Sequence, residues 1–320
     1  MLRRTALVSL AIGLFAGPLA ALANTWPTQP VHFVVPFPPG GSADGLTRML
    51  AQRMEAEWKQ PVIVDNKPGA GTIIGADAVA KSNDGHTIGL VIPSFAVNPG
   101  INPQMPYDTL KDLAAVTQIS TLPIALFASN TLPVSNVAEL IAYAKKNPKT
   151  LSYGSAGTGS TAHLAGQMLN QMAGIDMVHV PYKGSAPAQT DLIGGRLGLL
   201  FDSFVSQLPM VQAGRIKLIA AGGSQRLPGF PKVAPIGETV RGFAVESYFG
   251  VIAPRSTAAP VLAQIQQTIK RAMADPKIAS WMSSQGMVPV ASTPQEFEAF
   301  IDADMKKWAG VVKTLGGKIE

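Results

Sequence analysis

The chain uses one local construction twice, and this repetition constrains its fold more than any other feature. An apolar run at residues 31–35 leads into the turn PFPPGGSAD at 36–44 and then into a helical pattern. A second run at 151–153 leads into GSAGTGST at 154–161 and another helical pattern. Each turn predicts a helix N-terminus whose first backbone N–H groups lack intrahelical acceptors and suit an anion. Two copies predict two lobes that each supply one half of a site.

The rest of the chain continues the alternation of strand and helix patterns, which is typical of an α/β fold. Two apolar, extended segments, residues 117–129 and 243–253, are expected to cross between the lobes and to form a two-strand hinge. With these crossings, the expected domains are a first lobe of residues 24–123 and 244–320 and a second lobe of residues 124–243.

Three local patterns give expectations about single elements. Ser135 is expected to cap a helix that stops at Asn147, and residues 96–109, rich in asparagine and proline, predict a loop. Thr293 and Glu296 form a capping box around a proline, which predicts the start of the last helix.

The composition fits a compact protein and excludes several functional classes. Apolar residues make up 47% of the chain and charged residues 14%, which argues against disorder and against a coiled coil. Cysteine is absent, so disulfides, thiolate nucleophiles and cysteine-ligated metals are excluded. His32, His86, His163 and His179 lack metal-ligand spacing, and neither G-x-S-x-G nor a phosphate-loop motif occurs. We therefore expect no catalytic residue, no metal and no cofactor.

The N-terminus has the pattern of a cleavable export signal. Two arginines at 3–4 precede an apolar segment, residues 6–16, and an A-x-A cleavage sequence follows at 21–23. The apolar segment is too short for a membrane anchor and a glycine-proline pair follows it. We expect residues 1–23 to be removed, which lowers the formal net charge from +6 to +4. The remaining basic residues form no stripe, so nucleic acid is not an expected partner.

The first turn has two interpretations. Ser42 or Asp44 could cap the helix, with Asp44 paired to Arg48 one turn later; alternatively, the bare N–H groups bind a ligand. The second turn favours binding, because two helix N-termini that face one cleft suit an anion between them. The second turn also matches the dinucleotide fingerprint G-x-G-x-x-A, but weakly, since the available acid, Asp176, precedes the next strand instead of ending it.

Other candidate residues end predicted strands or lie on predicted loops. Asp202 and Ser203 end a strand, where α/β folds place ligand contacts, although they could equally cap the next helix. Phe37, Phe95 and Tyr182 could contact the apolar body of a ligand, or they could lie in the core.

Four motifs resemble the signatures of the Bug family, the periplasmic solute receptors of tripartite tricarboxylate transporters: PFPPGGSAD at 36–44, NKPGAG at 66–71, GSAGTGS at 154–160 and VPYKG at 180–184. The likeness covers residues 24–320. It implies a type II periplasmic-binding-protein fold with two α/β lobes and a deep cleft. It also implies that backbone and hydroxyl groups of the two glycine-rich loops hold a carboxylated small molecule, partly through ordered waters.

These observations together define an expected site and expected partners. The expected ligand-binding residues are Phe37, Gly40, Gly41, Ser42, Asp44, Ser94, Phe95, Ser155, Gly157, Thr158, Gly159, Ser160, Thr161, Tyr182, Asp202 and Ser203. We expect a monomer in the periplasm whose partners are a small carboxylate and either integral-membrane transporter subunits or a sensor protein. The alternative is an exported enzyme that uses Asp44 or Asp202 as acid or base on a small carboxylated substrate.

Overall fold

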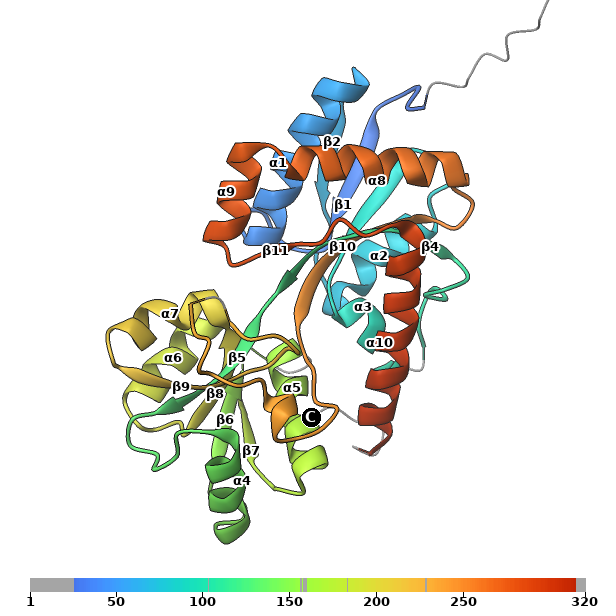
Figure 1. The fold of residues 1–320 in the computed structure, drawn as a ribbon. Coiled ribbons are helices and arrows are strands. Elements are labelled where there is room, and N and C mark those ends of the chain that lie inside the picture. The colour runs from blue at the N-terminus through green and yellow to red at the C-terminus, as the bar shows by residue number, and fades with distance from the viewer. Residues whose placement is uncertain are drawn as a thin grey trace, which may run out of the picture.

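The computed structural model describes residues 26–102, 104–155, 157, 160–182, 184–227 and 229–314. The expected export signal and two expected site residues, Thr158 and Gly159, lie outside the described residues. The described strands form two separate sheets, and helices pack on both. The chain therefore folds into two α/β lobes, as the sequence predicts (Figure 1).

The first lobe contains a six-stranded sheet of order β11-β4-β10-β3-β1-β2. Within this sheet, strands β1, β2 and β3 are parallel to one another. β10 runs antiparallel to both β3 and β4. β1 is buried almost throughout because its apolar side chains face helices on both sides of the sheet. The elements are β1 (Val31–Val35), α1 (Ser42–Trp58), β2 (Val62–Asn66), η1 (Ala70–Thr72), α2 (Ile73–Ala80), β3 (Thr87–Val91), α3 (Ser94–Ile101), β4 (Leu113–Leu122), β10 (Ser247–Pro254), α8 (Ala259–Met273), α9 (Pro276–Ser284), β11 (Val288–Pro289) and α10 (Pro294–Thr314).

The second lobe contains a five-stranded sheet of order β7-β6-β8-β5-β9. β6, β7 and β8 are parallel, and β5 runs antiparallel to β8 and β9. The elements are β5 (Ile124–Ser129), α4 (Val137–Lys146), β6 (Ser152–Ser155), α5 (Thr161–Ala173), β7 (Val178–Pro181), α6 (Ser185–Ile193), β8 (Leu199–Ser203), α7 (Phe204–Gln212), β9 (Ile216–Ala221) and η2 (Ile236–Glu238).

Two extended segments connect the lobes, at the places that the sequence predicts. β4 passes into β5 across Pro123, and the chain returns through the residues that precede β10. The two connections lie beside each other, because Ser247 of β10 pairs with Leu122 of β4. Figure 1 shows them as the green and orange strands between the lobes. This pair of strands is the two-strand hinge.

The lobes also touch outside the hinge. α10 runs from the first lobe toward the second and packs beside α5 (Figure 1). Trp308 and Val311 of α10 join the apolar core of the second lobe. At another edge, the turn after α9 meets α7, since a Cβ atom added to Gly286 would lie 2.0 Å from Cγ2 of Val205.

Two local expectations are wrong. Residues 96–109 do not form a loop throughout, because α3 includes Pro99. Pro99 removes one helical hydrogen bond, but packing against α10 buries the neighbouring residues Ala96 and Val97. The cap of α4 is Asn136, whose side chain accepts from Glu139 N at 2.9 Å, and Ser135 only precedes it.

Two further findings concern helices. The capping box before α10 is confirmed, because Thr293 Oγ1 accepts from Glu296 N and Glu296 Oε2 accepts from Thr293 N. None of the helices in the described part of the chain is long and apolar enough to cross a membrane.

Candidate ligand-binding site

The first glycine-rich turn leaves the N-terminus of α1 without a side-chain cap. Gly41 is the N-cap residue, in extended conformation, and it has no side chain with which to accept a hydrogen bond. Gly40 before it has φ +97°, a conformation that favours glycine. The first intrahelical bond of α1 is donated by Gly45 N to Gly41 O. Within the described residues, the N–H groups of Ser42, Ala43 and Asp44 therefore have no acceptor.

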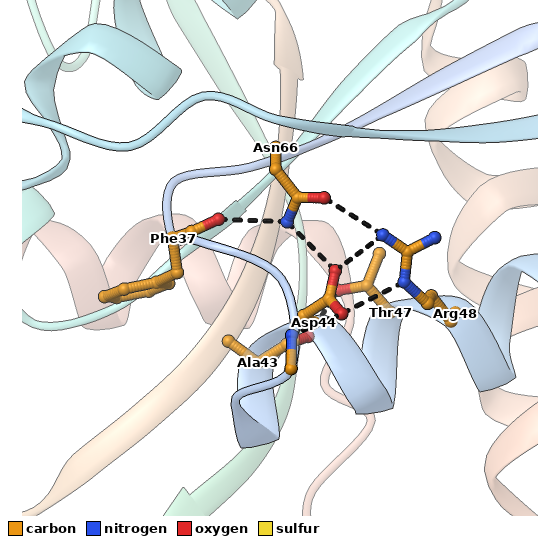
Figure 2. Close-up of polar contacts among 7 residues, drawn as sticks. Phe37, Ala43, Asp44, Thr47, Arg48 and Asn66 are labelled. Carbon is orange, nitrogen blue, oxygen red and sulfur yellow. Dashed lines mark hydrogen bonds and ion pairs between the residues drawn. The ribbon is translucent and has the colours of Figure 1, made fainter.

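Asp44 shapes this turn and does not face open space (Figure 2). Its carboxylate, in a residue only 3% exposed, accepts from Gly40 N at 3.0 Å, Asn66 Nδ2 at 2.9 Å and Arg48 Nε at 3.0 Å. Asn66 also donates to the Phe37 carbonyl at 2.9 Å. The hydrogen bond from Arg48 lowers the pKa of Asp44 to about 2 against the opposing effect of burial, and the bonds from Gly40 and Asn66 assist. The pairing of Asp44 with Arg48 is thus confirmed, whereas the expectation that Ser42 or Asp44 caps α1 is wrong, because the N-cap residue is Gly41 and no side chain caps the helix.

A pocket of about 480 Å³ opens beside the bare helix end. The turn contributes Phe37, Gly41 and Ser42 to its lining. The other walls come from β10 and from the ends of β3 and β4, which the sequence did not identify as part of a site. These walls contribute Ile92, Leu122, Ser247 and Phe249, and the turn and the start of α1 also contribute Pro38, Pro39 and Ala43. A larger pocket of about 580 Å³, near the end of α3, contains none of the expected site residues.

The second glycine-rich turn differs from the first because it caps its own helix. Ser160 Oγ accepts from His163 N at 3.2 Å and donates to Gly157 O at 2.7 Å. Thr161 is the first residue of α5. The two turns are therefore alike in sequence but not in hydrogen bonding. Among the described residues, the N-terminus of α1 has no side-chain cap, whereas the N-terminus of α5 is capped by Ser160.

A pair of stacked histidines lies behind the second turn. The His163 and His179 rings are 3.8 Å apart between centroids and nearly parallel. His179 Nε2 lies 2.8 Å from Ser155 Oγ, which also contacts the Gly157 backbone, so Ser155 is engaged within the protein. Burial lowers the pKa of both imidazoles to about 4, and for His163 the neighbouring His179 adds to this effect. The pair has a structural role in holding the turn.

The remaining second-lobe candidates are tied to neighbouring side chains. The Asp202 carboxylate, in a residue 6% exposed, accepts from Ser185 Oγ at 2.9 Å, Ser203 N at 2.8 Å and Gln207 Nε2 at 2.7 Å. Tyr182 Oη donates to an Asp191 carboxylate oxygen at 2.9 Å. Asp202 therefore holds the residues that begin α6 and α7. Ser203 is the N-cap residue of α7, the position that one alternative gave it, but no side chain caps this helix.

The candidates after β3 divide between surface and core. Phe95 is 1% exposed and stacks on Tyr107, so its side chain lies in the core, the alternative left open for it. Ser94 Oγ bonds to Thr72 Oγ1 at 2.8 Å. Among the expected residues, the structure brings Phe37, Gly41 and Ser42 together at the pocket, with Gly40 in the same turn. The described residues contain no cluster of side chains suited to a metal ion.

The chain is similar to known proteins over most of its length. Protein BugT of Bordetella pertussis (strain Tohama I) is 34% identical over 317 residues, which cover 97% of each chain. The solved structure of Rpa4515 from R. palustris with adipate has a TM-score of 0.75 at 34% identity, covering 91% of this chain and 98% of that one. MatC from Rhodopseudomonas palustris with bound malate has a TM-score of 0.73 at 27% identity, covering 90% of this chain and 100% of that one.

The family comparison covers most of the chain. Residues 46–317 match the model described as "Tripartite tricarboxylate transporter family receptor". This match includes the second sheet, every strand of the first sheet except β1, and the second glycine-rich turn, and it begins just after the first turn. The chain belongs to the family of tripartite tricarboxylate transporter receptors.

Proposed function

We propose that this protein is a periplasmic solute receptor that binds a small organic carboxylate at the N-terminus of α1. The observation that carries the proposal is the uncapped helix end, with three unpaired N–H groups, beside a pocket of about 480 Å³. A partly buried helix end contributes up to ~2 kcal/mol to an anion, and each hydrogen bond to a charged group ~1.5–3 kcal/mol. Three such bonds contribute roughly 5–9 kcal/mol before the cost of association is subtracted, whereas micromolar affinity requires about 8 kcal/mol, so burial of the rest of the ligand must supply the difference.

Relatives support this choice of ligand chemistry. One solved relative carries adipate and another carries malate, and both ligands are small carboxylates. At the first lobe we assign ligand contacts to Phe37, Gly40, Gly41 and Ser42. Asp44 and Ser155 act by positioning the turns, because their polar atoms are already engaged within the protein.

The second lobe completes the site by closing on the ligand. The proposed contacts are backbone groups of Gly157, Thr158, Gly159, Ser160 and Thr161 and the hydroxyl groups of Thr158 and Thr161, with Tyr182 and Ser203 at the rim; the Ser160 hydroxyl caps α5. The lobes move about the hinge, with boundaries at 123/124 and 243/244, where the two connections lie side by side.

Transport and sensing use the same ligand-driven closure. We propose that the ligand-bound form delivers its solute to integral-membrane transporter subunits, and the family description supports this choice. The N-terminal export pattern supports cleavage after residue 23 and release into the periplasm. Docking on a sensor protein is the other possible use of the closed form.

An enzyme role for Asp44 or Asp202 has weaker support. A carboxyl whose pKa is about 2 is ionised at neutral pH and is a poor general acid. Asp202 accepts four hydrogen bonds and is nearly buried. We therefore propose binding without turnover, which predicts that a bound acid is recovered chemically intact after long incubation.

Titration calorimetry against mono-, di- and tricarboxylates tests the proposed function, with the corresponding primary amides as controls. At least one acid should bind with micromolar affinity and raise the melting temperature, while its amide should bind far more weakly. Failure of every acid to bind at millimolar concentration would contradict the proposal. Appearance of a chemically altered product would instead favour the enzyme alternative.

A further inference from the structure

The pocket beside α1 has walls of one chemical kind. Phe37, Ile92, Leu122 and Phe249 present apolar side chains to it, and two prolines of the turn extend the same surface. Among the described residues, the lining includes no charged side chain. The nearest charged group of the turn, Asp44, faces Asn66 and Arg48, while the Phe37 ring lies away from them (Figure 2).

The polar groups of the lining are few and lie where a carboxylate is expected. Ser42 is the first residue of α1, next to the bare N–H groups, and its hydroxyl has no partner in the described residues. Ser247 is the second serine of the lining, on β10. A hydroxyl or ammonium group on the part of the ligand that lies against this wall would face apolar carbon and lose its hydrogen bonds to water.

The apolar wall is fixed before any ligand enters. Leu122 is the last residue of β4 and Ser247 is its registered partner on β10, so both belong to the hinge strands. Phe249, two residues further along β10, is 6% exposed and packs into the core of the first lobe. Because the wall is part of a paired sheet, the lobes can move without changing its chemistry.

Resting on the proposed function, we infer that the preferred ligands are carboxylic acids with an unsubstituted alkyl or aromatic body. Hydroxy acids and amino acids bind less well, because their extra polar groups meet the wall formed by Phe37, Leu122 and Phe249. Specificity thus resides in the first lobe and the hinge, and the helix end recognises only the carboxylate.

Calorimetry with matched pairs of acids tests this inference on the full mature protein. The pairs are succinate and malate, adipate and 3-hydroxyadipate, and benzoate and 4-hydroxybenzoate, each differing by one hydroxyl group. For every pair that binds, the unsubstituted acid should bind at least tenfold more tightly. Leu122→Thr places a hydroxyl in the wall with a residue that suits strands, and should reduce the preference to threefold or less. Leu110→Thr, outside the pocket lining, should retain it.

The outcomes separate this inference from the proposed function. If none of the six acids nor any acid of the wider screen binds, the proposed function fails and the inference fails with it. If acids bind but the hydroxylated members bind equally well or better, the inference is overturned and the receptor function stands. An unchanged preference in a folded Leu122→Thr protein would likewise overturn it.

Discussion

At the scale of single residues, Asp44 shows how a carboxylate near a binding site can serve the loop instead of the ligand. It ties Gly40 to Arg48 and Asn66, and so holds the turn that leaves the helix end open (Figure 2). The sequence predicts the pairing with Arg48 from its spacing of four. Asn66 begins the motif at 66–71, but the sequence does not predict its contact with Asp44, because Asn66 ends strand β2 and meets Asp44 only in the folded chain.

Asp44→Asn should destabilise the protein by about 1–3 kcal/mol, because it weakens several hydrogen bonds to a nearly buried group. Urea denaturation measures this change. Asp302→Asn is the matched control, since Asp302 and Lys306 form a pair of the same spacing on an exposed helix face. The control should change stability by less than about 0.5 kcal/mol. Equal effects of the two substitutions would contradict a positioning role for Asp44.

The stacked histidines predict a loss of stability in acid. The folded-state pKa of His163 and of His179 is about 4, below the ordinary value of 6.5. Between these values the unfolded chain binds more protons than the folded protein, so the free energy of unfolding falls as pH is lowered from about 6.5 to 4. Stability from this source is fully present above pH 6.5.

Denaturation at a series of pH values checks this prediction. His179→Gln keeps a side-chain amide near the Ser155 hydroxyl but removes one titrating group, so its stability should fall less steeply over the same range. If the mutant and the wild-type protein have the same slope between pH 6.5 and 4, the histidine pair is not the source of the acid sensitivity.

At the scale of elements, the N-termini of α1 and α5 follow similar glycine-rich turns but end differently. Ser160 caps α5, whereas Gly41 cannot cap α1. The shared glycine pattern predicts both helix starts correctly. It does not reveal which helix has an N-terminal N–H group already bonded to a side chain, because that depends on the rotamer of Ser160.

Gly41→Val should weaken ligand binding at least tenfold while leaving the fold intact. Gly41 has φ −82° and ψ 173°, which valine adopts readily, and no atom lies within 4 Å of an added Cβ. The added side chain therefore occupies pocket space and crowds the bare N–H groups. Gly310→Val is the control, since Gly310 on α10 is equally uncrowded and does not line the pocket. Calorimetry with the best acid should find near-normal affinity for the control alone.

Helix α3 shows where local pattern fails. Asparagine and proline disfavour a helix over its sequence, yet the helix forms because α10, about two hundred residues later, packs on it. The opposite holds for β1, whose apolar run predicts its bounds, and for α10, whose capping box predicts its start. Phe95, an expected contact residue, lies in the core because its ring stacks on Tyr107. The periodicity of apolar residues does not predict this contact.

At the scale of the whole molecule, the lobes are held by a hinge and by contacts on its flanks. The sequence predicts the crossings from their apolar, extended character. It does not predict that Leu122, Ser247 and Phe249 on them line a pocket, since this depends on which face of the paired strands meets the first turn. The sequence likewise does not predict the contact between Gly286 and Val205, because it depends on how the two lobes are placed in the folded chain.

Gly286→Ala should separate the lobes at this edge, because its methyl group would overlap Val205. Small-angle X-ray scattering should then give a larger radius of gyration. Gly174→Ala is the matched control, since Gly174 has a similar positive φ but no atom within 4 Å of an added Cβ. Val205→Ala in the Gly286→Ala protein should restore most of the compactness. An equal expansion in the Gly174→Ala protein would attribute the effect to backbone strain.

The uncapped end of α1 couples ligand binding to the local stability of a helix. An anion seated there accepts the hydrogen bonds that a capping side chain would otherwise accept, so the ligand completes the first turn. Because the ligand binds only when this turn is folded, tighter binding raises the free energy needed to open the turn. Amide hydrogens of Ser42, Ala43 and Asp44 should exchange with deuterium more slowly as ligand is added, while the His163 amide, which Ser160 already caps, should change little. Solute concentration thereby sets how firmly one end of this helix is folded.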